Sequence, residues 1–213
     1  MGEQATDSDQ ARPSPRPGRR RVVVLAGPSG SGKSRLAHRL RAARGWPVFR
    51  LDDFYRDEDD PAMPRHPDLG ILDWDHPDSW DADRAVAGLR ELLDTGRTEL
   101  PVYDISRSRA VGSHEVTAAP HDLVLAEGIF AADIVARLDA EGMLHSAWCV
   151  HHRPVVTFVR RLARDLKERR KSPPVLVRRG WRLMRDEPGI VARQTALGAA
   201  GSRAATVERS LLG

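Results

Sequence analysis

The chain has 213 residues, about the length of one catalytic domain, and a formal net charge of +4 at pH 7. Its single cysteine excludes an internal disulfide, and no apolar run is long enough for a secretory signal or a membrane span. We therefore expect a cytoplasmic protein without a membrane contact. Arginine far outnumbers lysine along the whole chain, so the positive charge reflects composition, and nucleic acid is not an expected partner.

Residues 1–20 are rich in serine, proline, arginine and aspartate and hold almost no large apolar side chain. Such a segment cannot offset the entropy that ordering would cost. We predict a disordered basic tail over 1–20, followed by one domain over 21–213.

A β-branched run over 22–26 leads into a glycine-rich loop that ends in Gly-Lys-Ser, and leucines at helical spacing follow. The spacing is that of a phosphate-binding P-loop. Backbone N–H groups of such a loop turn onto a polyphosphate, Lys33 supplies a positive charge, and the Ser34 hydroxyl can hold Mg²⁺. The residues assigned to nucleotide binding are Gly27, Ser29, Gly30, Ser31, Gly32, Lys33, Ser34 and Arg35.

A second strand is predicted over 47–51, and it delivers Asp52, Asp53 and Tyr55 to its C-terminal end. Ligands of open α/β sheets bind at that edge. Asp52 could accept a proton from an attacking hydroxyl or contact the metal. An acidic turn without a chemical role is the alternative. We expect Asp53 to be a solvated neighbour that could substitute in the metal shell.

The next segment, Asp75-His76-Pro77-Asp78, reads as a rigid turn before a helix over 82–94, with Ser79 or Asp81 as its cap and Gly96 at its end. Residues 100–104 and 110–116 are predicted to form a small β insertion.

Leu123–Ala126 is a further buried-strand candidate, and Glu127 at its tip is the expected metal-side acid. A last strand is predicted near 146–150, where Cys149 reads as a small buried hydrophobe. The run 160–171 has a helical pattern rich in arginine. It is either a solvated face or a mobile lid over transferring phosphate.

In this order, the P-loop and the segments Leu51–Tyr55, Asp73–Asp81, Leu100–Asp104, Leu123–Phe130 and Arg160–Arg169 resemble the uridine kinase-like family of P-loop kinases, from about residue 21 to 171. The resemblance implies an α/β, three-layer sandwich with a mainly parallel sheet, a small β insertion and a helical lid at about 154–171. It further implies ATP and Mg²⁺ as cofactors, a small-molecule hydroxyl acceptor as partner, and leaves a homo-oligomer open.

By position in that family, Asp52 corresponds to the base that activates the 5′-hydroxyl of uridine or cytidine, and Asp75 to the residue that holds the ribose hydroxyls. Tyr103 and Tyr55 fall at acceptor positions. The resemblance also gives catalytic roles to Lys33, Arg161 and Arg164. The two arginines would stabilise the transferred charge.

The chain departs from the family after Tyr103-Asp104, where Ile105 stands in place of an aromatic residue and Arg107 near the place of a histidine. A stacking ring and a base-reading imidazole are thereby lost, whereas Arg107 would suit an anionic acceptor. A kinase of pantothenate or a sugar phosphate is one alternative to a uridine or cytidine kinase. A nucleotide-binding regulator without catalysis is another.

Overall fold

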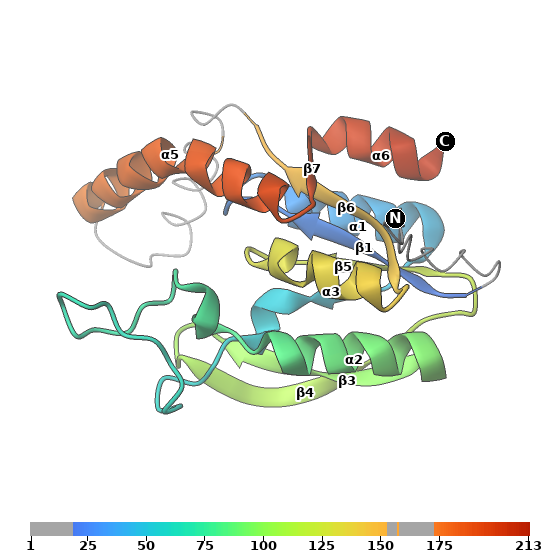
Figure 1. The fold of residues 1–213 in the computed structure, drawn as a ribbon, viewed down its shortest axis with the longest axis horizontal. Coiled ribbons are helices and arrows are strands. Elements are labelled where there is room, and N and C mark those ends of the chain that lie inside the picture. Colours follow the sequence, from blue (N-terminus) through green and yellow to red (C-terminus); the bar gives the residue numbers. More distant parts are fainter. Residues whose placement is uncertain (1–18, 153–156, 158–172) are drawn as a thin grey trace, which may run out of the picture.

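The computed structural model describes residues 19–152, 157 and 173–213. A five-stranded sheet forms its centre, in the order β2-β5-β1-β6-β7, and every neighbouring pair is parallel (Figure 1). The strands are β1 (Arg21–Ala26), β2 (Val48–Arg50), β5 (Leu123–Glu127), β6 (Leu144–Val150) and β7 (Ala200–Ser202). The four predicted strands are confirmed, and the short edge strand β7 is an addition.

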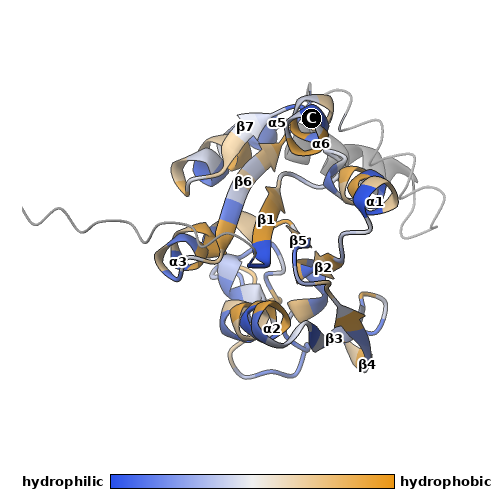
Figure 2. Cartoon of the chain, turned by 90° about the vertical axis from the view of Figure 1, so that its right-hand side faces the viewer, coloured by the Kyte–Doolittle hydropathy of each residue, from blue (hydrophilic) through white to orange (hydrophobic). Residues whose placement is uncertain are grey.

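Helices cover both faces of this sheet, which gives three layers (Figure 2). On one face Leu25 and Leu125 pack with α1 and α6; on the other Val24 and Ala126 pack with α2 and α3. The alternation follows from the strands, whose successive side chains point to opposite faces. The helices are α1 (Lys33–Arg44), α2 (Ala82–Thr95), α3 (Val135–Ala140), α5 (Pro173–Ala196) and α6 (Ala204–Leu212).

A separate antiparallel hairpin, β3 (Arg97–Asp104) with β4 (Arg109–Thr117), is the predicted β insertion. It packs against α2 and against η1 (Leu51–Phe54), a short 3-10 helix that follows β2. Leu100 of β3 is fully buried, whereas β4 is exposed along most of its length. The hairpin therefore stands over the end of β2 as an attachment to the sheet's edge.

The turn before α2 confirms the predicted caps. The Asp81 carboxylate accepts a hydrogen bond of 2.9 Å from the Arg84 N–H, and Gly96 ends the helix in the left-handed conformation. Two further 3-10 helices flank the site, η2 (Pro77–Ser79) and η3 (Ala131–Ile134). The loops that follow β2 and β5 thus contain short 3-10 helices, η1 and η3.

Two predicted segments fall mainly outside the described residues, the tail up to residue 18 and nearly all of the lid over 154–171. Arg161 and Arg164 are among them. Arg20 is described, and its guanidinium donates to the carbonyl groups of Leu93, Ala118 and Ala119.

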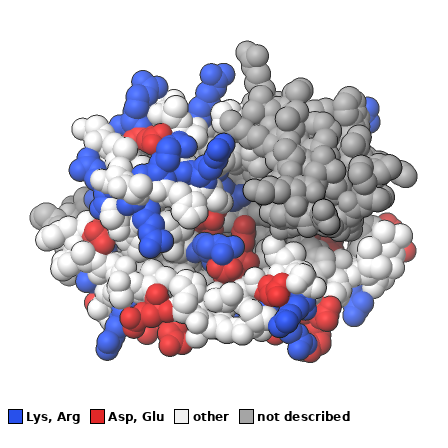
Figure 3. Space-filling model, turned by 180° about the vertical axis from the view of Figure 1, so that it is seen from behind, with Lys and Arg blue, Asp and Glu red and all other residues white. Residues whose placement is uncertain are grey.

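Of the helices described, none is long and apolar enough to cross a membrane. Seen from behind, basic side chains gather over α1 and α6 (Figure 3).

Candidate active site

Three strands end side by side at one edge of the sheet, and each end carries a predicted site residue. The P-loop follows β1, Asp52 follows β2, and Glu127 is the last residue of β5. Glu127 is in register with Leu25 of β1 and with Arg50 of β2. Because the three strands are parallel and adjacent, the segments that follow them lie close together, as the sequence predicts.

The P-loop depends on glycine for its path. Gly27, Gly30 and Gly32 have φ angles of 145°, 85° and 96°, which side chains rarely tolerate. A Cβ on Gly27 would run into the Val150 carbonyl oxygen at the end of β6. Gly32 caps α1 by accepting from the Leu36 N–H at 2.9 Å, so the loop runs straight into the helix's positive N-terminal end.

Lys33, Ser34 and Glu127 form the polar base of the loop. The Ser34 hydroxyl donates to Glu127 Oε2 at 2.9 Å, and Lys33 and Glu127 are only 5% and 4% exposed. Burial raises the pKa of Glu127, an effect that the Lys33 ammonium partly offsets and the Asp52 carboxylate increases. A buried carboxylate in this position favours a nearby cation.

The donor set fits Mg²⁺. Within the described ranges no cluster of three or more His, Cys, Asp or Glu side chains could form an all-protein metal cage. Mg²⁺ is instead held by one or two oxygen side chains together with phosphates and water. Ser34 and Glu127 supply such a pair. The Ser31 hydroxyl, fully buried inside the loop, has no hydrogen-bond partner among the described residues and is free to meet a ligand oxygen.

Asp52 and Asp53 are adjacent in sequence but face different surroundings, because η1 turns them to different sides. Asp52 Oδ1 accepts from the Ile129 N–H at 2.9 Å. Asp53 is 3% exposed; its Oδ1 lies 3.6 Å from the Arg50 guanidinium, and its Oδ2 has no partner among the described residues. The expectation that Asp53 is solvated is wrong, because the β3–β4 hairpin covers η1.

Gly128 makes the approach of Asp52 to Ile129 feasible. A Cβ at residue 128 would lie 2.8 Å from Leu51 Cβ and 3.0 Å from Asp52 Oδ1. The loop after β5 therefore touches η1 directly. Neither this contact nor the hydrogen bond from Ile129 is visible in the sequence pattern.

Tyr55 contacts three other aromatic side chains, which form a cluster near Asp52. Its ring centroid lies 6.0 Å from that of Trp74, 5.8 Å from that of Tyr103 and 6.2 Å from that of Phe130. Burial raises the pKa of the Tyr55 hydroxyl, and the Asp52 and Asp75 carboxylates raise it further. The Tyr55 hydroxyl is therefore a donor and not a base. Trp74 and Phe130 lie in segments that carry the family resemblance, but neither is predicted from the sequence as a site residue.

Of the remaining acceptor-side candidates, Asp75 is exposed in the loop before η2, whereas Tyr103 and Arg107 lie on the hairpin. The Tyr103 hydroxyl donates to the Arg56 carbonyl oxygen at 3.0 Å and ties β3 to the loop after η1. Arg107, whose side chain is 70% exposed, lies 3.6 Å from the Asp104 carboxylate, and Ile105 is 63% exposed. The structure thus brings Tyr103 and Tyr55 together and leaves Ile105 and Arg107 at the exposed tip of the hairpin.

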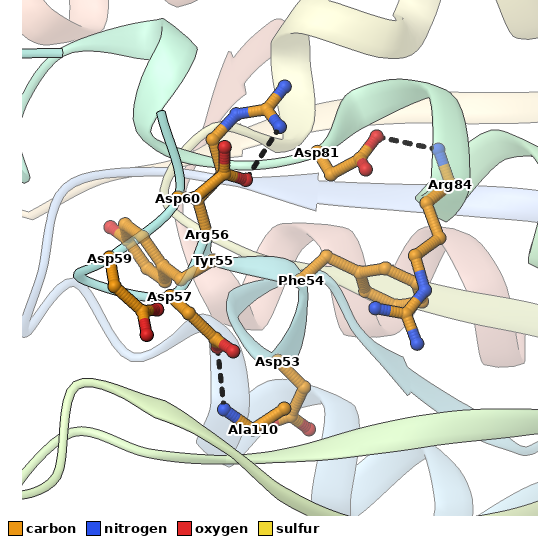
Figure 4. Close-up of a pocket in the computed structure, with 10 residues that line it drawn as sticks. All are labelled: Asp53, Phe54, Tyr55, Arg56, Asp57, Asp59, Asp60, Asp81, Arg84 and Ala110. Carbon is orange, nitrogen blue, oxygen red and sulfur yellow. Dashed lines mark hydrogen bonds and ion pairs between the residues drawn. The ribbon is translucent and has the colours of Figure 1, made fainter. Parts of the chain in front are cut away.

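A pocket of about 250 Å³ lies beyond Tyr55, between the loop after η1 and the hairpin (Figure 4). Most of its acidic side chains already have partners: Asp60 with Arg56, Asp81 with the Arg84 N–H and Asp57 with the Ala110 N–H (Figure 4). It contains none of the P-loop residues. We regard it as a hollow beside the acceptor loop and not as the phosphate site.

Comparison with known proteins agrees with this geometry. The family model for the Phosphoribulokinase / Uridine kinase family matches residues 22–194. Uridine kinase of Deinococcus deserti is 30% identical over 159 residues, 73% of each chain, and uridine kinase of Lactobacillus johnsonii is 29% identical over 155 residues, 71% of this chain and 70% of its own.

A solved kinase structure from Silicibacter sp. TM1040, assigned provisionally to fructose transport, superimposes with a TM-score of 0.61 at 23% identity and covers 85% of this chain and 89% of that one. At that identity the likeness shows the fold, an α/β P-loop kinase domain. With the family model matching from β1 to the end of α5, the chain belongs to the phosphoribulokinase/uridine kinase family and is a kinase that transfers phosphate to a hydroxyl group.

Proposed function

We propose that this kinase uses ATP and Mg²⁺ to phosphorylate the 5′-hydroxyl of uridine or cytidine. The observation that carries the proposal is that Asp52 lies close to two sets of groups. Its carboxylate raises the pKa of Glu127, which accepts a hydrogen bond from Ser34 of the P-loop, and also the pKa of Tyr55, whose ring lies 5.8 Å from that of Tyr103. A base close to both a phosphate site and an aromatic cluster suits transfer from a nucleotide to a ring-bearing alcohol.

On the donor side, the P-loop from Gly27 to Ser34 would hold the triphosphate with its backbone N–H groups and the Lys33 ammonium, and Arg35 would add charge at the start of α1. Ser34 and Glu127 would hold Mg²⁺, which when bound neutralises charge on the phosphate oxygens. Lys33 lies buried beside Glu127, so its charge is poorly screened and acts strongly on a bound anion.

On the acceptor side, Asp52 would take the proton of the attacking hydroxyl. A sugar hydroxyl is a weak nucleophile until its proton has an acceptor, and the Ile129 N–H holds the carboxylate in one orientation. Asp75 would accept hydrogen bonds from the two ribose hydroxyls, and Tyr55 and Tyr103 would contact the nucleoside.

Arg161 and Arg164 would stabilise the transferred charge from a lid over 154–171. They belong to the proposal through the family resemblance, since they lie outside the described residues. We propose the same division of the chain as the sequence predicts, a tail over 1–20 and one catalytic domain over 21–213.

The test is Asp52→Asn. We expect this variant to bind ATP as the parent does and to lose about 10²- to 10⁴-fold in turnover, because the amide cannot accept the proton. Uridine or cytidine monophosphate is followed by mass spectrometry, and ATP binding by a fluorescent analogue. The matched control is Asp53→Asn, the adjacent carboxylate that faces the hairpin. Parent-like turnover of Asp52→Asn would reject the assigned base.

A second acceptor class is favoured by one observation, the exposed Ile105 and Arg107 where the family has an aromatic ring and a histidine. A kinase of pantothenate or of a sugar phosphate would keep every donor-side role. Incubating the protein with Mg²⁺-ATP and separate pools of nucleosides, pantothenate and sugar phosphates decides between the classes. ATP binding without any phosphorylated product would favour a nucleotide-binding regulator.

A further inference from the structure

Gln194, in the last turn of α5, is a buried polar residue that no motif accounts for. Its side chain is 2% exposed, and both ends of its amide are engaged. Oε1 accepts from the Cys149 thiol at 3.2 Å, and Nε2 donates to the Ile129 carbonyl oxygen at 2.8 Å. The amide thus joins the end of β6 to the loop after β5.

Ile129, which Gln194 contacts, also contacts Asp52. The Ile129 carbonyl accepts from Gln194, and the Ile129 N–H donates to Asp52 Oδ1 at 2.9 Å. A single backbone residue is therefore fixed from both sides. Its position decides where the Asp52 carboxylate can find a donor.

Packing alone does not explain a glutamine at this position. Burying an amide costs free energy unless its hydrogen bonds are made, and an apolar side chain of similar size would fill the same space. Such a side chain would leave the Ile129 carbonyl without this donor. Burial also raises the pKa of the Cys149 thiol to about 11, so at neutral pH the thiol keeps its proton and can donate to Gln194.

The neighbouring residue provides a contrast. Arg193, whose side chain is half-exposed, pairs with Asp133 of η3 at 2.8 Å, so the same turn of α5 contacts the same region through an ion pair. That pair joins the helix to η3 and does not touch Ile129. The two contacts can be removed one at a time.

We propose that Gln194 is a positioning residue for phosphoryl transfer, which holds Ile129 so that the Ile129 N–H orients the Asp52 carboxylate. The inference rests on the proposed function, in which Asp52 is the base. Gln194 lies outside the P-loop and the acceptor cluster, so its loss should lower turnover and leave ATP affinity unchanged.

The test compares Gln194→Met, which keeps the length of the side chain but cannot donate, with the control Arg193→Met. Hydrogen exchange of backbone amides is measured by NMR on ¹⁵N-labelled protein without ligands. In Gln194→Met we expect the Ile129 amide to exchange at least about tenfold faster. The reference is the amide of Leu125 in β5, which donates to the Pro47 carbonyl and should exchange as in the parent. Arg193→Met should leave the Ile129 amide as in the parent.

Turnover is measured in parallel with Mg²⁺-ATP and uridine. We expect kcat of Gln194→Met to fall about tenfold with an unchanged KM for ATP. Unchanged exchange at Ile129, equal acceleration at Ile129 and Leu125, or an unchanged kcat despite faster exchange would each overturn the proposal. If Gln194→Met does not fold, Gln194→Asn, whose amide is one methylene group shorter and loses the contact with the Ile129 carbonyl, is judged by the same exchange criteria.

The two proposals fail separately. Asp52→Asn with parent-like turnover would remove the assigned base, whatever Gln194 does. Asp52→Asn without turnover, together with parent-like exchange in Gln194→Met, would keep the base and remove the role of Gln194. The exchange measurement needs no acceptor, so it tests the contact between Gln194 and Ile129 even if uridine is not the substrate.

Discussion

The proposed site has two halves that are built from different parts of the fold. The proposed donor half is made of the P-loop and Glu127, and the proposed acceptor half of Tyr55, Asp75 and the tip of the β3–β4 hairpin. Donor groups sit on the ends of the buried strands β1 and β5, and Lys33 and Glu127 are at most 5% exposed. Acceptor groups sit on loops and a hairpin at the sheet's edge, where Asp75 is exposed.

The difference separates chemistry from selectivity. The position of Glu127 cannot change without moving the central sheet, whereas Ile105 and Arg107 can be exchanged at little cost to the core, since they are exposed. Asp52 stands at the boundary, on a short turn between the sheet and the hairpin. Substitutions on the two sides of this boundary should therefore have unequal effects.

Among the substitutions that compare the two halves, the largest effect is expected for Gly128→Ala, at the contact between the loop after β5 and η1. The added methyl group would lie 2.8 Å from Leu51 Cβ and 3.0 Å from Asp52 Oδ1, so η1 has to move. Misplacing a reacting group by about 1 Å can cost about 10²-fold in rate, and we expect a loss of that order in kcat. Steady-state kinetics with Mg²⁺-ATP and the acceptor measure it.

Gly112→Ala is the matched control on the hairpin. Gly112 pairs with Val102, and a Cβ there would have nothing within 4 Å. We expect parent-like kcat. If the two alanine variants lose activity equally, the boundary drawn at Asp52 is in the wrong place.

A smaller effect is expected for Tyr103→Phe in the acceptor half. The substitution removes the hydrogen bond from the Tyr103 hydroxyl to the Arg56 carbonyl and loosens the hairpin from the loop after η1. One neutral hydrogen bond contributes about 1 kcal/mol, so we expect the acceptor KM to rise about fivefold while the KM for ATP stays constant. Val102→Thr, on an exposed neighbour in β3, is the control. An equal rise in both KM values would contradict the division into halves.

The sequence predicts where the residues of the proposed donor half lie because its signals are local. The P-loop spacing, the buried run 123–126 and the acid at its tip each lie within one short segment, and parallel topology brings their ends together. The hairpin and the cap of α2 are predicted for the same reason. Each element carries its own pattern.

Contacts between distant segments could not be predicted from such patterns. Gln194 is 65 residues from Ile129, and nothing in its neighbours signals that its amide turns inward. The local pattern places Asp53 in solvent because acidic turns usually are solvated, yet the hairpin, some 50 residues further along, covers it. Burial of a polar residue by a remote element leaves no mark on the local sequence.

Asp53→Asn should have the smallest effect, and it falls on stability alone. Burial raises the pKa of Asp53 above its ordinary value of 3.8, although Arg50 partly opposes this. The folded protein therefore binds a proton on Asp53 more readily than the unfolded chain does. The protonated Asp53 side chain contributes stability that is present below the unfolded pKa and is lost as pH rises through the folded pKa. At neutral pH the charged Asp53 carboxylate lowers the free energy of unfolding, and replacing it with the neutral amide of asparagine removes this effect.

We expect Asp53→Asn to raise the free energy of unfolding by about 1 kcal/mol at pH 7, with the gain closing toward about pH 4, as measured by urea unfolding across this range. Asp104→Asn is the control of opposite sign. Hydrogen bonds from the Ser106 hydroxyl and N–H lower the pKa of Asp104, so its carboxylate stabilises the fold at neutral pH and the amide should weaken it. If Asp53→Asn weakens the fold at pH 7, the charged Asp53 carboxylate does not destabilise the fold; if it lowers kcat, Asp53 shares the role proposed for Asp52.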